Sequence, residues 1–380
     1  MNNKRFFLPF FVCVTFIFVI SITGCDKSVF PTSHLEENQT DNSQTPQLPE
    51  NPQTPQLPQS PQAPENPQPP QPPQASQPPD IPQSLTWYVS TNGNSANKGT
   101  DPASPLAQAA DALSKIKNLY KSGKWPAGES AVIIISGTVT GSGNLGANGS
   151  MLDVSGAGNY PPIILKGDPS TGGILDANGA NTGGRILYIA NNKVTLGDKL
   201  TLTGGARLWG GAVCVGTAGS DSEGEFIMAG GEISGNKGGS GGAVMVYKGG
   251  MTMSGGIIKN NSNNFNQNDG NGGGIYLNAY TSFTMTGGTI AENGDNVKTE
   301  NGGGLFIDGR ARAVMSGGEI LNNTARNSGG GVNVSSYGEF TMTGGTISGN
   351  TAAEKGSVYV EKYGAVFNRT GGVISGNTPD

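Results

Sequence analysis

Histidine and cysteine are nearly absent from this chain of 380 residues, and each absence removes a class of chemistry. The single histidine, His34, lies in a polar N-terminal stretch, so the rest of the chain cannot use imidazole as an acid, a base or a metal ligand. Of the three cysteines, Cys13 and Cys25 lie in the N-terminal region and only Cys214 lies further on. The later part of the chain therefore has no cysteine pair for a disulfide, a metal site or redox chemistry.

Charged residues are also scarce, at 13% of the chain, and the formal net charge is −5. No basic cluster is present, which argues against nucleic acid as a partner. Glycine and proline are abundant instead, with 62 and 24 copies. The prolines crowd into residues 46–82 and the glycines dominate after Gly137, so the chain divides into at least three segments.

The first segment has the features of an export signal. Lys4 and Arg5 precede an apolar run that ends near Ile20. The sequence that follows, Ile-Thr-Gly-Cys ending at Cys25, resembles the lipobox of bacterial lipoproteins. The resemblance implies a signal peptide over 1–24, cleavage before Cys25 and acylation of that thiol and of the new N-terminus. Two or more acyl chains anchor a protein stably. An uncleaved membrane anchor is the alternative, because the apolar run is near the lower length limit for spanning a bilayer.

Residues 25–84 are predicted to form a disordered, proline-rich stalk. Prolines recur at every third position from Pro46 to Pro73. Polyproline II has three residues per turn and rises about 3.1 Å per residue, so this stretch can extend roughly 85 Å. The interpretation is a spacer that holds a domain away from the membrane; a ligand for a proline-recognition domain is the alternative.

Residues 85–203 are predicted to hold an N-terminal cap and the first turns of a solenoid. Apolar residues at helical spacing run from Ala109 to Leu119, with Ser104 as a candidate N-cap and Gly123 as a candidate C-cap. An extended run begins at Ala131. A short helix here would close one end of a stack of repeats.

Residues 204–380 are predicted to be glycine-rich repeats of the same solenoid. The stretch FTMTGGTI occurs at both Phe283 and Phe340, and its glycine doublet recurs at intervals of 25 to 32 residues. A period in this range with β-rich pieces indicates stacked β-coils. Alternation before each doublet points Phe and Met inward and Thr outward.

Two further columns recur in every repeat. Ile-x-x-Asn follows each doublet, which predicts a stacked amide ladder at a turn that tolerates left-handed backbone, formed by Asn236, Asn261, Asn293, Asn323, Asn350 and Asn377. A third strand with inward aliphatic pairs, such as Val244 with Val246, follows a glycine-rich loop. Three strands per turn, each parallel to its copies, predict an all-β fold: a right-handed parallel β-helix.

The repeats resemble those of the polymorphic outer-membrane protein family. The resemblance rests on GGAV at Gly210 and Gly241, GGGI at Gly272, GGGL at Gly302 and the Ile-x-x-Asn elements. It covers roughly 204–380, with Ile in place of the family's Phe. The stretch YVSTNG with KGTDPASPL is similar to the start of pectin-lyase-like β-helix domains. The family resemblance implies a surface protein with an adhesive role.

One outward residue per turn lies in the third strand, giving the row Cys214, Met245, Tyr276, Phe306, Asn333 and Tyr359. This row either forms a contact surface or is covered by the preceding loops. Long insertions adjoin it, and the candidate ligand site is formed by Tyr276, Phe306, Tyr359, Asp269, Asp295 and Glu300. These carboxylates are candidate Ca²⁺ ligands, although no spacing matches a calcium loop. A turn column of Lys248, Tyr280, Arg310, Tyr337 and Tyr363 predicts a cation–π stack around Arg310.

The sequence predicts a surface-displayed, lipid-anchored, adhesin-like binding module without catalysis, cofactor or metal. It would sit at a bacterial outer membrane or cell surface and contact glycans, host proteins or neighbouring proteins through one face. The alternative is a polysaccharide lyase or glycosidase. Glu232 and Glu319 recur at one repeat position but lie three turns apart, too far to act on one bond. An open edge at the last turn predicts edge-to-edge self-association.

Overall fold

The computed structural model describes residues 85–141, 148–178, 184–217, 221–265 and 269–379. The predicted signal peptide, the lipidation site Cys25 and the stalk over 25–84 lie outside these residues. Within the described part of the chain, no helix is long and apolar enough to cross a bilayer.

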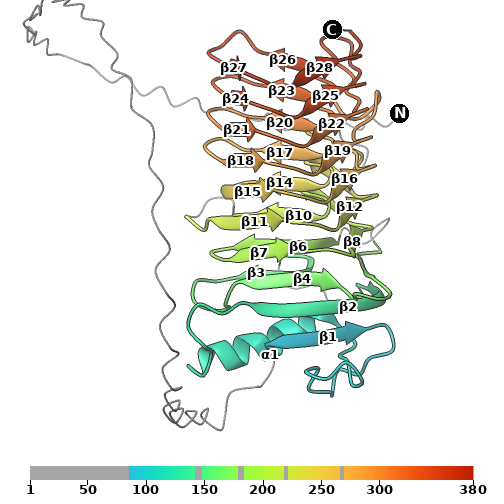
Figure 1. Cartoon of the computed structure of the whole chain (residues 1–380), viewed down its shortest axis with the longest axis vertical. Coiled ribbons are helices and arrows are strands. Elements are labelled where there is room, and N and C mark those ends of the chain that lie inside the picture. The colour runs from blue at the N-terminus through green and yellow to red at the C-terminus, as the bar shows by residue number, and fades with distance from the viewer. Residues whose placement is uncertain (1–84, 142–147, 179–183, 218–220, 266–268, 380) are drawn as a thin grey trace, which may run out of the picture. The chain divides into compact units, whose positions relative to one another are not determined.

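The described residues form a stack of turns, each built from three short strands (Figure 1). The first sheet contains β1 (Thr86–Ser90), the first half of β2 (Ala131–Thr140), β4 (Ile163–Gly167), β7 (Lys193–Leu196), β11 (Gly224–Met228), β15 (Gly249–Met253), β18 (Ser282–Met285), β21 (Arg312–Met315), β24 (Glu339–Met342) and β27 (Val366–Arg369). The second sheet contains the second half of β2, β5 (Gly173–Asp176), β8 (Leu200–Thr203), β12 (Glu232–Ser234), β16 (Ile257–Lys259), β19 (Thr289–Ala291), β22 (Glu319–Leu321), β25 (Thr346–Ser348) and β28 (Val373–Ser375).

The third sheet contains β3 (Ser150–Ser155), β6 (Arg185–Ala190), β10 (Val213–Val215), β14 (Val244–Val246), β17 (Ile275–Leu277), β20 (Leu305–Ile307), β23 (Val332–Val334) and β26 (Val358–Val360). A separate parallel pair, β9 (Ala206–Trp209) and β13 (Lys237–Ser240), lies in the loops between the second and third sheets.

Every strand pairs in parallel with its copies in the neighbouring turns. Met251 of β15, for example, lies opposite Phe226 on one side and Phe283 on the other. About eight turns repeat this pattern, and the predicted right-handed parallel β-helix with three strands per turn is confirmed.

The core follows the predicted columns. In the first sheet, Phe226 and Met228 are fully buried and Thr252 is half-buried on the outer side, so the predicted alternation is confirmed. Ile233 of the second sheet and Val213 of the third are also fully buried. Three apolar columns therefore meet in one continuous interior, and burial of this surface is the main stabilising contribution.

One helix, α1 (Ala109–Lys121), packs at the N-terminal end of the stack against β1, β2 and β3 (Figure 1). It buries Ala109, Ala112, Leu113 and Ile116, which confirms the predicted capping helix. The predicted N-cap at Ser104 is wrong, because the helix begins five residues later, after Gln108. Leu106 between them is fully buried and bridges to Val89, so tertiary contacts hold this stretch extended.

The six predicted asparagines form a continuous ladder, here called the asparagine ladder. The side-chain amide of each of the first five donates to the Oδ1 atom of the next copy at 2.9–3.0 Å. Each also donates to a backbone carbonyl of the preceding turn, as Asn293 does to Ile258 at 2.9 Å. The left-handed backbone of this turn is taken by the residue before each asparagine, such as Glu292 at φ 54° and Asn322 at φ 54°.

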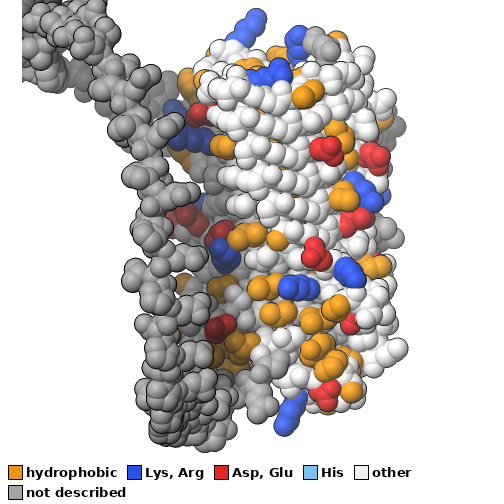
Figure 2. All heavy atoms as spheres, in the orientation of Figure 1, with side chains coloured by type: hydrophobic (Ala, Val, Ile, Leu, Met, Phe, Trp, Pro, Cys, Tyr) orange, Lys and Arg blue, Asp and Glu red, His pale blue; other side chains and the backbone are white. Residues whose placement is uncertain are grey.

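Charges are sparse on the outside of the stack. On the face that Figure 2 shows, acidic and basic side chains are interspersed among uncharged ones, and neither sign gathers into a large patch.

Candidate functional site

The outward row of the third sheet is mostly covered. Cys214, Met245, Phe306 and Asn333 are 1–5% exposed, and only Tyr276 and Tyr359 are half-buried. Of the two alternatives, a contact surface or a covered row, burial of these four residues favours the covered row. Cys214 and Met245 instead form a second small apolar cluster with Tyr188 and Ala190.

Polar contacts with neighbouring segments close this row. The Nδ2 atom of Asn333 donates to the Oγ atom of Ser328, a loop residue, at 2.9 Å. Tyr276 stacks on Phe306 at 5.1 Å between ring centroids and donates its hydroxyl to Asp308 at 2.6 Å. Burial, assisted by the Asp308 carboxylate, raises the pKa of Tyr276. Phe306, a predicted ligand contact, is thus 5% exposed and sits within the structure.

The three predicted acidic residues lie in neighbouring loops, as expected, but the chain's own groups bind them. Arg326 forms ion pairs with Asp269 and with Glu300, both at 2.9 Å, and Lys298 reaches Asp269 at 3.1 Å. The hydrogen bonds from Arg326 and Lys298 hold the pKa of Asp269 below its usual range. Sequence reasoning missed Arg326, the residue that joins this cluster.

Asp295 has a local role. Its Oδ1 atom accepts from the backbone N–H of Val297 at 2.8 Å and from that of Lys298, which closes a turn. Among the described residues, no group of three or more acidic, histidine or cysteine side chains is arranged to hold a metal ion.

Exposed aromatic side chains lie instead at the turn between the third and first sheets. The guanidinium of Arg310 lies 5.6 Å from the ring centroid of Tyr280 and 5.1 Å from that of Tyr337, so the predicted cation–π stack is confirmed. Arg310 also donates to the Tyr280 hydroxyl at 2.8 Å. Tyr280 is 73% exposed and Tyr337 is 57% exposed. These three residues are here called the Tyr–Arg ridge.

The backbone of the Tyr–Arg ridge is left-handed. Tyr280, Arg310 and Tyr337 have φ values of 65°, 61° and 60°, a region that favours glycine or asparagine. At the last turn the corresponding position is Gly364 rather than the predicted Tyr363, because Phe367 lies opposite Phe340 and shifts the alignment by one residue. A Cβ atom on Gly364 would lie 2.7 Å from the Tyr337 ring.

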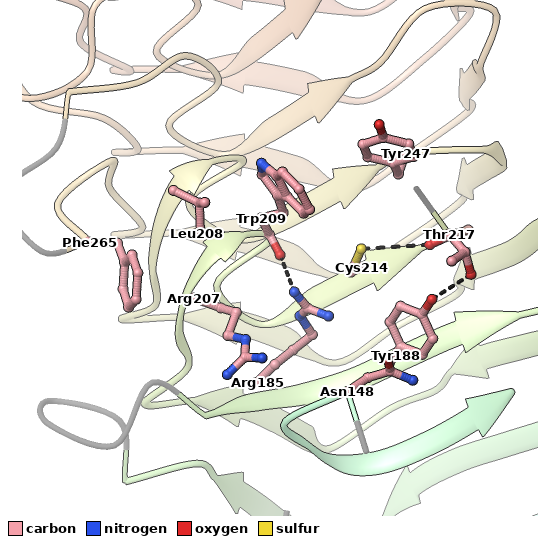
Figure 3. A pocket seen from close by; sticks show the side chains of 11 residues that line it. Asn148, Arg185, Tyr188, Arg207, Leu208, Trp209, Cys214, Thr217, Tyr247 and Phe265 are labelled. Carbon is pink, nitrogen blue, oxygen red and sulfur yellow. Dashed lines mark hydrogen bonds between the residues drawn. The ribbon is translucent and has the colours of Figure 1, made fainter. Parts of the chain in front are cut away.

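A cavity of about 470 Å³ lies outside the third sheet, nearer the N-terminal end (Figure 3). Arg185 and Tyr188 of β6 and Cys214 of β10 line it. Strand β9 lies alongside, and its Leu208 and Trp209 are 45% and 44% exposed. The remaining lining residues are Asn148, Arg207, Gly216, Thr217, Tyr247 and Phe265. Sequence reasoning did not identify this site.

Arg185 lies in the middle of these side chains (Figure 3). It is 5% exposed, and its Nη2 and Nε atoms donate to the backbone carbonyls of Trp209 at 2.5 Å and Gly210 at 3.2 Å. Its guanidinium also lies 5.7 Å from the ring centroid of Tyr188. Among the described residues, no carboxylate forms an ion pair with Arg185. Burial lowers its pKa.

The position of Arg185 is a glycine in later turns. Leu187 lies opposite Val213, so Arg185 corresponds to Gly211, the second glycine of GGAV. A Cβ atom on Gly211 would lie 2.3 Å from the carbonyl oxygen of Gly242, so the later turns exclude a side chain there. The stretch GRIL ending at Leu187 is therefore a variant of the GGAV motif. An arginine in place of the second glycine is the feature of the sequence that could have pointed to this cavity.

Comparisons of the sequence with protein families, with curated proteins and with solved structures find no match.

Proposed function

We propose that this protein is a surface-displayed, lipid-anchored β-helix binding module that contacts a glycan through the Tyr–Arg ridge and performs no catalysis. The lipid would be carried by Cys25, at a bacterial outer membrane or cell surface. The resemblance of the repeats to polymorphic outer-membrane proteins, and of the N-terminal part to pectin-lyase-like domains, supports an adhesive surface role. The fold alone does not determine a function, and the Tyr–Arg ridge is the feature that supports glycan contact.

The observation that carries the proposal is the exposure of large side chains at strained positions. A non-glycine residue with left-handed backbone costs of order 1 kcal/mol, and the ridge places Tyr280, Arg310 and Tyr337 there in succession. Solvent-exposed aromatic faces are typical of surfaces that contact sugars or proteins. The backbone at these positions would suit asparagine better than tyrosine, and a contact that needs the aromatic ring explains why tyrosine is present.

The surface beside the ridge has room for a sugar chain. A groove of about 430 Å³ is lined by Tyr280, Thr281, Ser282, Arg310, Arg312, Tyr337 and Glu339. It offers two aromatic faces together with hydroxyl, carboxylate and guanidinium groups, which can donate to and accept from sugar hydroxyls. This mixture favours a glycan over a purely apolar partner.

The test is a double variant, Tyr280→Asn with Tyr337→Asn, examined against a panel of neutral and acidic polysaccharides. Asparagine tolerates left-handed backbone, so we expect the melting temperature to be unchanged or slightly raised while co-elution of a polysaccharide with the protein is lost. Tyr363→Asn is the matched control, because Tyr363 is as exposed as Tyr280, at 73%, but is not part of the cation–π stack around Arg310.

Two outcomes would contradict the proposal. If the double variant binds as the unchanged protein does, the ridge is a structural stack only. If a polysaccharide becomes shorter during incubation, the protein is a lyase or glycosidase and the binding-module assignment is wrong.

A further inference from the structure

We propose that the cavity around Arg185 binds a small carboxylate that carries an apolar ring, with Arg185 contacting the carboxylate. The proposal uses none of the ridge residues and does not depend on the glycan-binding proposal above. It rests on a buried cation to which the described part of the chain supplies no counter-ion, on the cavity that this cation lines, and on the apolar side chains around it.

The charge of Arg185 is buried among neutral groups. A guanidinium has five N–H donors, and Arg185 uses two of them on the carbonyls of Trp209 and Gly210. Buried charges in proteins are paired or coordinate metals, because burial of an isolated ion costs several kcal/mol. Carbonyl groups and the ring of Tyr188 solvate the cation but leave its charge unbalanced. An anion in the cavity would balance it.

Two other charged side chains, Arg207 and Asp153, lie close enough to act on Arg185. Arg207 also lines the cavity, and its positive charge helps to lower the pKa of Arg185. Asp153 of the neighbouring strand β3 is the acidic side chain that acts on Arg185, and it raises the pKa of Arg185 only weakly. One oxygen of Asp153 accepts from Asn148 at 2.8 Å. Among the residues that the structure describes, Asp153 forms no ion pair with Arg185 and acts on it only weakly, so the buried guanidinium of Arg185 favours an anion in the cavity.

Apolar and aromatic side chains line part of the cavity. Trp209 and Leu208 are almost half exposed beside the cavity, and the ring of Trp209 lies 5.8 Å from that of Tyr247 at an interplanar angle of 46°. Phe265 contributes a further aromatic side chain. A volume of about 470 Å³ lies within the range of small-molecule sites, which combine apolar walls with a few polar groups. These walls favour an aromatic ring over a sugar ring.

The geometry allows one binding mode for such a ligand. A planar guanidinium and a carboxylate form paired, charge-assisted hydrogen bonds, which fix the orientation of the anion. The apolar ring would then extend from Arg185 toward Trp209 and Tyr247. Because the corresponding position in later turns is glycine packed against backbone, this arrangement occurs once along the described stack.

The test is calorimetric titration of the full-length chain with 2-naphthoate and with its uncharged isostere 2-naphthamide. We expect naphthoate to bind at least about tenfold more tightly, because a hydrogen bond to a charged group contributes more than a neutral one. Arg185→Gly restores the glycine of the GGAV motif and should remove this preference. Its melting temperature without ligand should be equal or higher, since a buried unpaired charge is lost.

Two control variants separate this site from other effects. Arg312→Gln removes a positive charge outside the cavity and should leave naphthoate affinity unchanged, whereas Trp209→Ala should weaken it. The ridge variant Tyr280→Asn with Tyr337→Asn should bind naphthoate normally, whatever its effect on glycans. Equal affinity for naphthoate and naphthamide, or no binding of either, would overturn the proposal, and the ligand pair decides this even if Arg185→Gly does not fold. Tighter binding of galacturonate than of naphthoate would overturn the assignment of an apolar ring.

Discussion

Replacing Asn293 by alanine removes one amide from the middle of the asparagine ladder and should lower the free energy of unfolding by about 4 kcal/mol. Asn293 is fully buried and donates to Asn323 at 3.0 Å and to Ile258 at 2.9 Å. The Oδ1 atom of Asn293 also accepts from the backbone N–H of Asn261 at 3.2 Å and from the side-chain amide of Asn261 at 2.9 Å. Four hydrogen bonds are lost at roughly 1 kcal/mol each, and the partners left behind stay buried.

The assay is urea unfolding of the full-length chain followed by circular dichroism, with Asn118→Ala as the control. Asn118 lies exposed on α1, so its replacement should change the free energy of unfolding by less than about 0.5 kcal/mol. If Asn293→Ala lowers the free energy of unfolding no more than Asn118→Ala does, the asparagine ladder does not hold the turns together.

The isosteric change Asn293→Asp adds a dependence on pH. A carboxylate here would be buried and would face the Ile258 carbonyl, so its pKa in the folded state should rise above the value of about 3.9 expected in the unfolded chain. The folded state then binds the proton more tightly. The variant should be most stable below about pH 4 and should lose stability as the pH rises through the folded pKa, relative to the unchanged protein.

Two further predictions concern the loops and the acidic cluster. Gly303→Ala should lower the free energy of unfolding by about 2 kcal/mol or more, because the new Cβ would lie 2.6 Å from backbone atoms of Thr324, whereas Gly309→Ala should cost much less, since its nearest such neighbour is 3.5 Å away. Urea midpoints that fall equally for both would contradict this. Arg326→Met should raise the pKa of Asp269 toward its ordinary value, as followed by NMR titration, because the hydrogen bond from Arg326 is the main cause of its lowered pKa. An unchanged Asp269 titration would show that Lys298 alone holds it.

The columns of the β-helix were predictable because each turn repeats the same physical constraints. Inward Phe and Met alternate with outward residues in successive turns, and Asn recurs at one buried corner. A residue that is ambiguous in one turn can therefore be assigned from the aligned residues of the neighbouring turns. The cation–π stack at Arg310 followed from the same alignment. At the last turn the alignment failed by one residue, since the partner of Phe340 is Phe367 and not Val366.

The strands, the inward residues, the asparagine ladder and the stacking at the ridge could therefore be predicted from the repeats alone. Which outward residues are exposed could not be predicted, because it depends on contacts of the loops, within one turn as between Ser328 and Asn333 and across turns as between Arg326 and Asp269. The start of α1 was decided in the same way, by burial of Leu106 against the first strand. Arg185 was visible as one letter in GRIL, but its burial among neutral groups arises from the ring of Tyr188 on its own strand and from the carbonyls of Trp209 and Gly210 in the next turn.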